Sequence, residues 1–219
     1  FRRVLFRSVV DESSLRRGRA TANAMFGNAA SVLVGDFLYS RAFQMMVEAR
    51  DMRILEVMAE ATNVIAEGEV MQLMNMHNAD LDEASYLEVI RSKTAKLFEA
   101  CARVGAILAG ASATMEEACA TYGQALGTAF QIVDDVLDYT GDVKLLGKNL
   151  GDDLREGKIT LPLIAAKRLA NASEQAMLAS AIKNGDVSQI DAIVDVVRNT
   201  GALVVARQAA AQEIGRAHV

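Results

Sequence analysis

The stretch GTAFQIVDDVLDYTGD (127–142) places acidic residues inside an apolar helical pattern. Asp134 and Asp138 are four residues apart, so on a helix they share one face and lie one turn from each other. Like charges at this spacing repel and weaken an isolated helix by roughly 0.2–0.5 kcal/mol. Apolar residues flank both acids, and burying an unpaired carboxylate among them is costly. The stretch therefore predicts a long helix whose acids face a wet cavity or bind a cation, although a DDxxD run alone is also typical of a solvated acidic face.

Apolar residues recur at helical spacing along most of the chain. Asp82 has the residue type of a helix N-cap, and the single proline, Pro162, fits a chain of long helices because an interior proline breaks a helix. No segment alternates with period two for long enough to predict a strand. We predict long helices at 28–48, 51–76, 82–109 and 114–140, and shorter ones near 160–170, 173–184, 187–199 and 201–212. Long helices on short connections indicate an all-α antiparallel bundle.

The composition argues against several classes of protein. The chain has 219 residues with 23 Lys and Arg against 28 Asp and Glu, a formal charge of −5, so no nucleic-acid partner is expected. Hydrophobic residues make up 52%, which is typical of a globular chain rather than a disordered one. No apolar run reaches the ~18 residues that a transmembrane segment needs. Cys101 and Cys119 cannot form a disulfide framework, which favours a reducing, cytoplasmic location.

One short DNA segment, read on its two strands, can account for both ends of the chain. A short segment, which we identify as a sequencing-library adapter, can encode residues 1–8 (FRRVLFRS) on one strand and residues 213–219 (EIGRAHV) with a stop codon on the other. A chance match of this length is remote. We therefore expect 1–8 and 213–219 to be adapter-derived, and 9–212 to be a single helical domain truncated at both ends.

The carboxylates of residues 127–142 are of the type that binds magnesium. Mg²⁺ accepts one or two carboxylates, keeps several waters and takes further ligands from substrate phosphates. Asp134, Asp135 and Asp138 are therefore candidate Mg²⁺ ligands. The chain contains no HExxH and no CxxC pattern, which argues against a zinc site.

Three other places hold cationic side chains that could meet a phosphate. Arg16 and Arg17 are adjacent guanidiniums, which suit a diphosphate because arginine makes bidentate contacts. Lys93 and Thr94 lie inside an otherwise apolar helical pattern. Taken singly, such features are more often solvated surface charges or a snorkelling lysine. The third place is a glycine-rich stretch that mixes acids and cations: Lys148, Asp152, Asp153, Arg155 and Lys158.

Taken together, these residues resemble a known family, the trans-isoprenyl diphosphate synthases of the bacterial long-chain type. The resemblance implies an all-α fold around a deep central cavity, where two Asp-rich motifs hold Mg²⁺ against the diphosphate of an allylic substrate. It implies condensation of isopentenyl diphosphate with that substrate to a long all-trans polyprenyl diphosphate, such as an octaprenyl chain for quinones, by a homodimer. The matching runs follow the family's order and cover essentially all of 9–212: VVDESSLRRGRATAN (9–23), GNAASVLVGDFLYSRAFQMM (27–46), GEVMQLMN (68–75), RSKTAKLFEA (91–100), GTAFQIVDDVLDYTGD (127–142) and LGKNLGDDLREGKITLPL (146–163).

The resemblance also implies roles for individual residues. Arg17 matches the contact to isopentenyl diphosphate, and Lys158 matches a lysine of the loop after the second Asp-rich motif. The Mg²⁺ ligands match Asp11 of the first motif and Asp134, Asp135 and Asp138 of the second. Contacts to the allylic diphosphate match Arg16, Lys93, Thr94, Gln131 and Lys148. The candidate catalytic residues among these are Lys93, Asp134, Asp135 and Lys148.

The chain departs from the family in the first Asp-rich motif. Arg7 and Ser8 stand where its first two aspartates should be, and the adapter hypothesis explains that difference. We therefore expect the chain as given to be catalytically impaired. Two alternatives stay open: a non-catalytic regulatory partner of a prenyl synthase, and a terpene cyclase of the same helical class.

Overall fold

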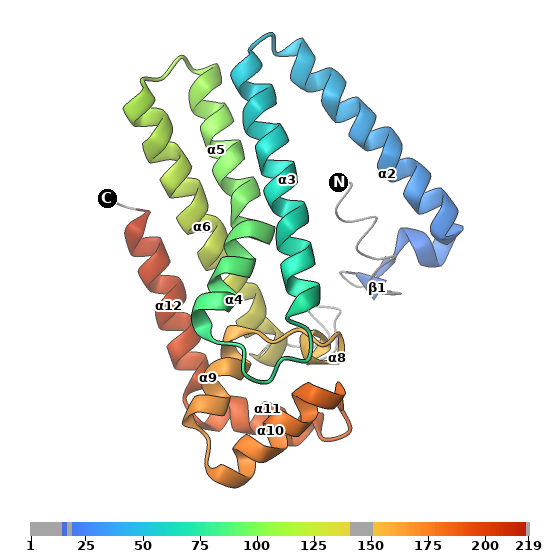
Figure 1. Ribbon diagram of the computed structural model, residues 1–219, viewed down its shortest axis with the longest axis vertical. Helices are drawn as coiled ribbons and strands as arrows, with labels where there is room; N and C mark the ends of the chain where they lie inside the picture. The colour runs from blue at the N-terminus through green and yellow to red at the C-terminus, as the bar shows by residue number, and fades with distance from the viewer. Residues whose placement is uncertain (1–14, 17–18, 141–150, 218–219) are drawn as a thin grey trace. The chain divides into compact units, whose positions relative to one another are not determined.

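The structure is a computed structural model that describes residues 15–16, 19–140 and 151–217. Over these residues the regular elements are helices and one two-stranded ladder, which confirms the all-α prediction (Figure 1). The chain divides into two compact units, each described by itself: Phe1–Leu55 with Gly141–Asn149, and Glu56–Thr140 with Leu150–Val219.

The first unit contains a short ladder that the sequence did not predict. Strand β1 (Leu15–Arg16) pairs antiparallel with β2 (Arg19–Ala20), so that Leu15 lies opposite Ala20. Two paired residues on each side are too few to leave a period-two pattern.

Helix α2 (Ala22–Glu48) follows the ladder and begins earlier than the predicted residue 28. Gly27 interrupts it with φ 80° and ψ 164°. These values lie outside the helical region, and glycine adopts them readily because it has no Cβ. The interruption separates a first short turn from the regular helix, so the apolar pattern located only the regular part.

The second unit contains the remaining long helices. Helix α3 (Met52–Met74), most of which belongs to this unit, and α6 (Ala113–Thr140) lie within two residues of their predicted bounds. The predicted helix 82–109 consists of three consecutive elements: α4 (Glu83–Ile90), the π-helical turn η1 (Arg91–Ala95) and α5 (Lys96–Leu108).

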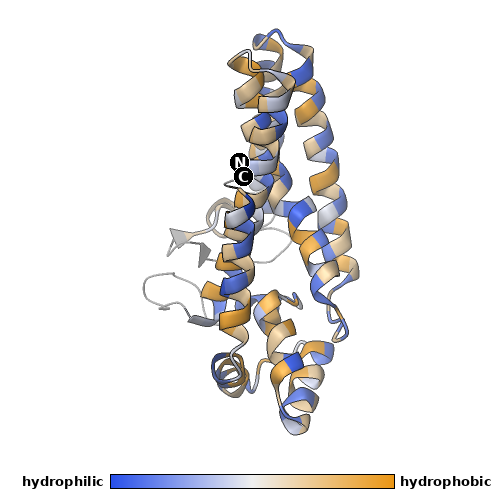
Figure 2. Cartoon of the chain, turned by 90° about the vertical axis from the view of Figure 1, so that its left-hand side faces the viewer, coloured by the Kyte–Doolittle hydropathy of each residue, from blue (hydrophilic) through white to orange (hydrophobic). Residues whose placement is uncertain are grey.

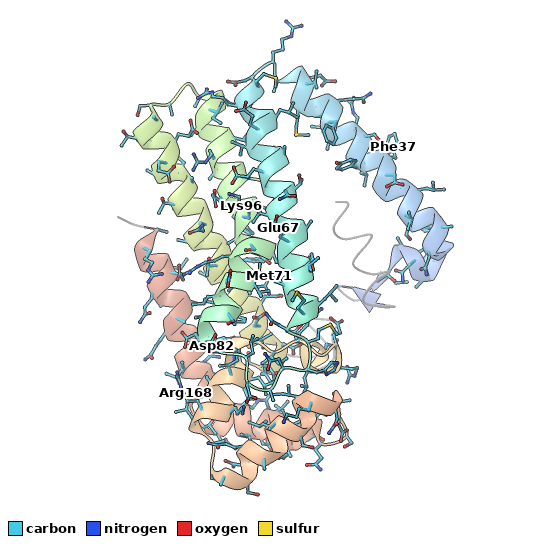
Figure 3. The ribbon with its side chains drawn as sticks, in the orientation of Figure 1. Phe37, Glu67, Met71, Asp82, Lys96 and Arg168 are labelled. Atoms are coloured by element: carbon cyan, nitrogen blue, oxygen red, sulfur yellow. The ribbon has the colours of Figure 1, made fainter. Side chains whose placement is uncertain are left out.

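Asp82 caps this helical segment as predicted, and Figure 3 labels it at the start of α4. Its carboxylate accepts a hydrogen bond from the Ser85 backbone N–H at 2.8 Å, which satisfies a donor that the first helical turn leaves unpaired. A π turn inserts one residue without ending the helix, so the apolar period alone did not reveal η1.

Among residues 151–217 the structure describes five helices, and four of them were predicted. Pro162 lies in the first turn of its helix, where its missing N–H costs nothing, and Asn171 and Glu174 form a capping box at the start of the next. The helix α8 was not predicted because four residues carry no period. The five are α8 (Asp152–Arg155), α9 (Leu161–Leu169), α10 (Ala172–Asn184), α11 (Ile190–Asn199) and α12 (Ala202–Arg216).

Helix α12 continues past its predicted end at residue 212. The carboxylate of Glu213 is largely buried and pairs with the Arg91 guanidinium of η1 at 3.0 Å. This ion pair lies beyond the predicted end, and the helix continues to Arg216.

The long helices of the second unit run side by side (Figure 1). Lys96, labelled in Figure 3, joins α5 to α3 through an ion pair with Glu60 at 2.9 Å. Hydrophobic and hydrophilic residues alternate around these helices, as expected of amphipathic segments (Figure 2). No helix among the described residues is long and apolar enough to cross a membrane. The core gathers large apolar side chains from α6 and α9–α11: Ile132, Tyr139, Leu161, Leu163, Leu178, Ile193 and Val197.

Candidate active site

The π-helical turn η1 carries Lys93 and Thr94, both of which are buried. The backbone N–H of Lys96 donates to the carbonyl of Arg91, five residues earlier, which is the hydrogen bond that defines a π turn. The extra residue changes the direction of the side chains on this turn relative to those of α4. Such turns occur frequently at functional sites, so η1 is a candidate site element.

Two glycines allow neighbouring helices to approach η1 closely. A Cβ added at Gly68 of α3 would lie 2.7 Å from the Lys93 backbone nitrogen, and one at Gly127 of α6 would lie 2.7 Å from the Ala95 Cα. Real Cβ atoms do not tolerate such distances to backbone. The absence of a side chain at these two positions therefore positions Lys93 and Thr94 between α3 and α6.

Gly68→Ala is expected to lower the free energy of unfolding by about 1–3 kcal/mol, because overpacking forces the backbone of η1 to shift. Urea denaturation of the chain measures this change. Gly105→Ala on α5 is the matched control, since its Cβ would meet nothing within 4 Å. Alanine favours a helix over glycine by about 1 kcal/mol, so the control should be stabilised. A Gly68→Ala chain as stable as the control would contradict this account of η1.

Lys93 is held by the two polar residues that interrupt the apolar face of α3. Its ammonium, on a residue only 6% exposed, pairs with Glu69 Oε2 at 2.9 Å and donates to Gln72 Oε1. A buried ammonium is stable only with such partners. The positive charge beside Glu69 and Gln72 is therefore supplied by a side chain of this protein, Lys93.

Asp134, Asp135 and Asp138 lie in three different environments on α6. Asp134 is exposed, Asp138 is half-buried, and Asp135 is buried with 3% exposure. Asp135 Oδ2 accepts a hydrogen bond from the Tyr86 hydroxyl at 2.5 Å, and its Oδ1 accepts one from Gln131 Nε2 at 2.8 Å. Burial and the negative charge of Asp153 raise the pKa of Asp135 well above its usual value, against the effect of the two hydrogen bonds.

Gln131 connects the acids to η1. Its Oε1 accepts a hydrogen bond from the Thr94 hydroxyl at 2.9 Å, and its Nε2 lies 3.5 Å from Asp134 Oδ2. The structure therefore brings together Thr94, Gln131, Asp134 and Asp135, four of the residues predicted to form the site. Lys93 is adjacent to Thr94 on the same turn.

The glycine-rich stretch also approaches these acids. The backbone N–H of Asp153 donates to Asp138 Oδ2 at 3.3 Å, and that of Gly151 donates to the Asp138 carbonyl at 3.1 Å. Asp153 therefore adds a fourth carboxylate near the acids of α6. Lys158 is half-buried, pairs with Glu156, and donates its backbone N–H to the Asp153 carbonyl.

Several predicted site residues are not tested by these contacts. Asp11, Arg17 and Lys148 lie outside the described residues, and Arg16 is described only as part of β1. Their roles stay predictions. Tyr86, in contrast, was missed, because no local pattern pairs it with Asp135, which lies 49 positions later in the chain.

The donor set suits an ion that needs few protein ligands. Among the described residues, no cluster of three or more His, Cys, Asp or Glu side chains is arranged to hold a metal. Asp134 and Asp138 offer hard oxygen donors, whereas each Asp135 oxygen already accepts a hydrogen bond. This arrangement fits Mg²⁺, which binds through one or two carboxylates and takes other ligands from water and phosphate.

Exposed apolar side chains lie next to these acids. Phe130, Val133 and Leu137 follow one another at helical spacing on α6, each between 39% and 56% exposed. Helix α3 carries a similar set, Val70, Leu73 and Met74. An apolar ligand attached to an anionic group would find partners for both ends here.

Comparisons with known proteins identify the family of the chain. Residues 8–198 match the polyprenyl synthetase family. The chain is 52% identical over 215 residues to the octaprenyl diphosphate synthases of Haemophilus influenzae and Escherichia coli, covering 98% of this chain. It spans 65% and 67% of the lengths of those two relatives. A polyprenyl synthase structure from Caulobacter crescentus, complexed with calcium and isoprenyl diphosphate, matches with TM-score 0.94 and 45% identity over 99% of this chain and 66% of that one.

Proposed function

Because the chain belongs to the polyprenyl synthetase family, we propose that it comes from a trans-polyprenyl diphosphate synthase. Such an enzyme condenses isopentenyl diphosphate with an allylic diphosphate. The observation that carries the proposal is the hydrogen-bonded set that joins Thr94, Gln131 and Asp135, next to the buried cation Lys93. It supports the proposal because a hydroxyl, an amide and an ammonium lie close to carboxylates, an arrangement that a plain helical bundle does not require.

The proposed mechanism uses this chain's residues to hold and stabilise the diphosphate. When bound at Asp134 and Asp138, Mg²⁺ would supply positive charge for the departing diphosphate. Lys93 would stabilise negative charge on a phosphoryl oxygen as the C–O bond ionises to an allylic cation. Glu69 and Gln72 hold the ammonium in place beforehand, so little reorganisation accompanies the reaction. The double bond of isopentenyl diphosphate then attacks the cation, and a proton is lost to the departing diphosphate.

A long apolar product is supported by the exposed side chains beside the acids. Phe130, Val133 and Leu137 would contact the growing prenyl chain. Relatives named as octaprenyl diphosphate synthases support an octaprenyl product. The homodimer and the cytoplasmic location stay predictions.

We also propose that residues 1–8 and 213–219 are adapter-derived, and that the incomplete first motif impairs the chain. The source DNA upstream of the Val9 codon tests the first point: two Asp codons would support it, and Arg and Ser codons would contradict it. Arg7→Asp with Ser8→Asp would complete a DDxxD motif that ends at Asp11.

The completed motif is expected to raise Mg²⁺-dependent product formation at least about tenfold over the chain as given, because it adds metal ligands. Labelled isopentenyl diphosphate incorporated onto farnesyl diphosphate measures this. Arg2→Asp with Ser14→Asp makes the same charge change outside the motif and should have no such effect. Equal turnover by the chain as given and the restored chain would contradict the impairment.

The same assay separates the two alternative functions. A terpene cyclase would consume the allylic diphosphate without isopentenyl diphosphate. A regulatory partner would bind magnesium diphosphate without turnover, even with the first motif restored.

A further inference from the structure

A buried chain of hydrogen bonds runs from α4 through α6 to η1. The Tyr86 hydroxyl donates to Asp135 Oδ2 at 2.5 Å, and Gln131 Nε2 donates to Asp135 Oδ1 at 2.8 Å. The Thr94 hydroxyl then donates to Gln131 Oε1 at 2.9 Å. We call these four residues, Tyr86, Asp135, Gln131 and Thr94, the Tyr86 relay.

Asp135 sets the direction of every hydrogen bond in the Tyr86 relay. Both oxygens of Asp135 accept hydrogen bonds, so Gln131 turns its amide nitrogen toward Asp135 and its oxygen toward Thr94. Thr94 has a single hydroxyl proton and must then donate it to that oxygen. The orientation of two side chains beside Lys93 therefore follows from the orientation of one carboxylate.

Tyr86 holds that carboxylate at the oxygen that Gln131 does not contact. Tyr86 and Asp135 are each 3% exposed, so bulk water does not replace either partner. Each oxygen of Asp135 accepts one hydrogen bond, and Tyr86 supplies the one to Oδ2. Without the hydroxyl, the carboxylate could rotate about its Cβ–Cγ bond and lose its alignment with Gln131, because that torsion is soft.

We propose that Tyr86 is a positioning residue of the diphosphate site, acting through Asp135 on Gln131 and Thr94. This inference rests on the proposed function, since it assumes that the site binds a diphosphate. Tyr86 itself does not touch the substrate. It fixes which hydrogen-bonding groups Gln131 and Thr94 present beside Lys93.

The test measures binding of inorganic pyrophosphate with Mg²⁺ to the 219-residue chain by calorimetry. Tyr86→Phe is expected to raise the Kd about tenfold, because a hydrogen bond to a charged group no longer orients the relay. Asp135→Asn should raise it at least as much. Combining the two should add nothing to Asp135→Asn alone, because both variants interrupt the same relay.

Tyr139→Phe is the matched control. Tyr139 is fully buried on the same helix as Asp135, but its hydroxyl makes no hydrogen bond within the Tyr86 relay. Its removal should change thermal stability without changing the Kd for pyrophosphate. If Tyr86 had a purely structural role, Tyr86→Phe would likewise change thermal stability without changing the Kd for pyrophosphate.

Two results would overturn the proposal: an unchanged Kd in Tyr86→Phe, or additive effects of Tyr86→Phe and Asp135→Asn. If the unsubstituted chain does not bind magnesium pyrophosphate, the same variants are compared in the chain with Arg7→Asp and Ser8→Asp. If that chain does not bind it either, the proposed function fails, a result distinct from an unchanged Kd in Tyr86→Phe. If Tyr86→Phe does not fold, the unsubstituted chain decides by proton NMR. The downfield Tyr86 hydroxyl resonance should move when magnesium pyrophosphate is added, and an unmoved resonance would overturn the proposal.

Discussion

Asp134→Asn is expected to reduce prenyl transfer by about a thousandfold in the chain with the first motif restored, Arg7→Asp with Ser8→Asp. Removing one group that stabilises developing charge in the transition state costs about 10²–10³ in rate, and loss of a metal ligand acts in the same direction. Asp134 is the exposed acid of its motif, and Asp135 is already engaged by Tyr86 and Gln131. We therefore expect Asp134 to contribute more to Mg²⁺ binding than its neighbour does.

A Mg²⁺ titration of the turnover rate distinguishes this role from a loss of folding. Asp134→Asn should need a higher Mg²⁺ concentration for half of its maximal rate, while its thermal stability stays close to that of the parent. Asp195→Asn, an exposed aspartate on α11, is the control and should leave both quantities unchanged. An Asp134→Asn enzyme with an unaltered Mg²⁺ requirement would rule out Asp134 as a ligand.

Lys93→Met is expected to weaken binding of magnesium pyrophosphate about 100-fold, since a hydrogen bond to a charged group contributes about 1.5–3 kcal/mol. It should also lower the free energy of unfolding by about 2 kcal/mol, because Glu69 loses its cation. That figure lies below the cost of breaking a fully buried pair, since the Glu69 side chain keeps 34% exposure. Calorimetry and urea denaturation measure the two effects on the same chain.

A second substitution separates the two effects of Lys93→Met. Adding Glu69→Gln removes the carboxylate that had paired with Lys93, so most of the lost stability should return while pyrophosphate binding stays weak. Lys96→Met removes a cation that pairs with Glu60 and Glu99 between α3 and α5, and should leave pyrophosphate binding unchanged. If the Lys93→Met, Glu69→Gln chain regained binding, Lys93 would be a structural cation and not a diphosphate donor.

The helices were predictable from the sequence because their signals are local. Apolar spacing located the long helices within a few residues, and the capping residue Asp82 marked the start of α4. Errors arose where the backbone departs from a regular helix, at Gly27 in α2 and at the π turn η1. Both departures insert or reorient residues without changing which residue types are apolar.

The shared face of the acids was also predictable from the sequence, because residues four apart lie on one face of any helix. This spacing predicted that Asp134 and Asp138 share one helix face. It could not distinguish the exposed Asp134 from the buried Asp135, because burial depends on which helices pack against α6.

Only the tertiary structure decided which side chains meet. Tyr86 reaches Asp135 across 49 positions of the chain, and Lys93 reaches Gln72 across 21. No local pattern encodes such pairs, since they exist only after α3, α4 and α6 have packed around η1. The sequence by itself determined the helices and the types of chemistry they carry. Packing determined which carboxylate is held by hydrogen bonds and which is left to bind a metal, because only packing excludes water from one and not from the other.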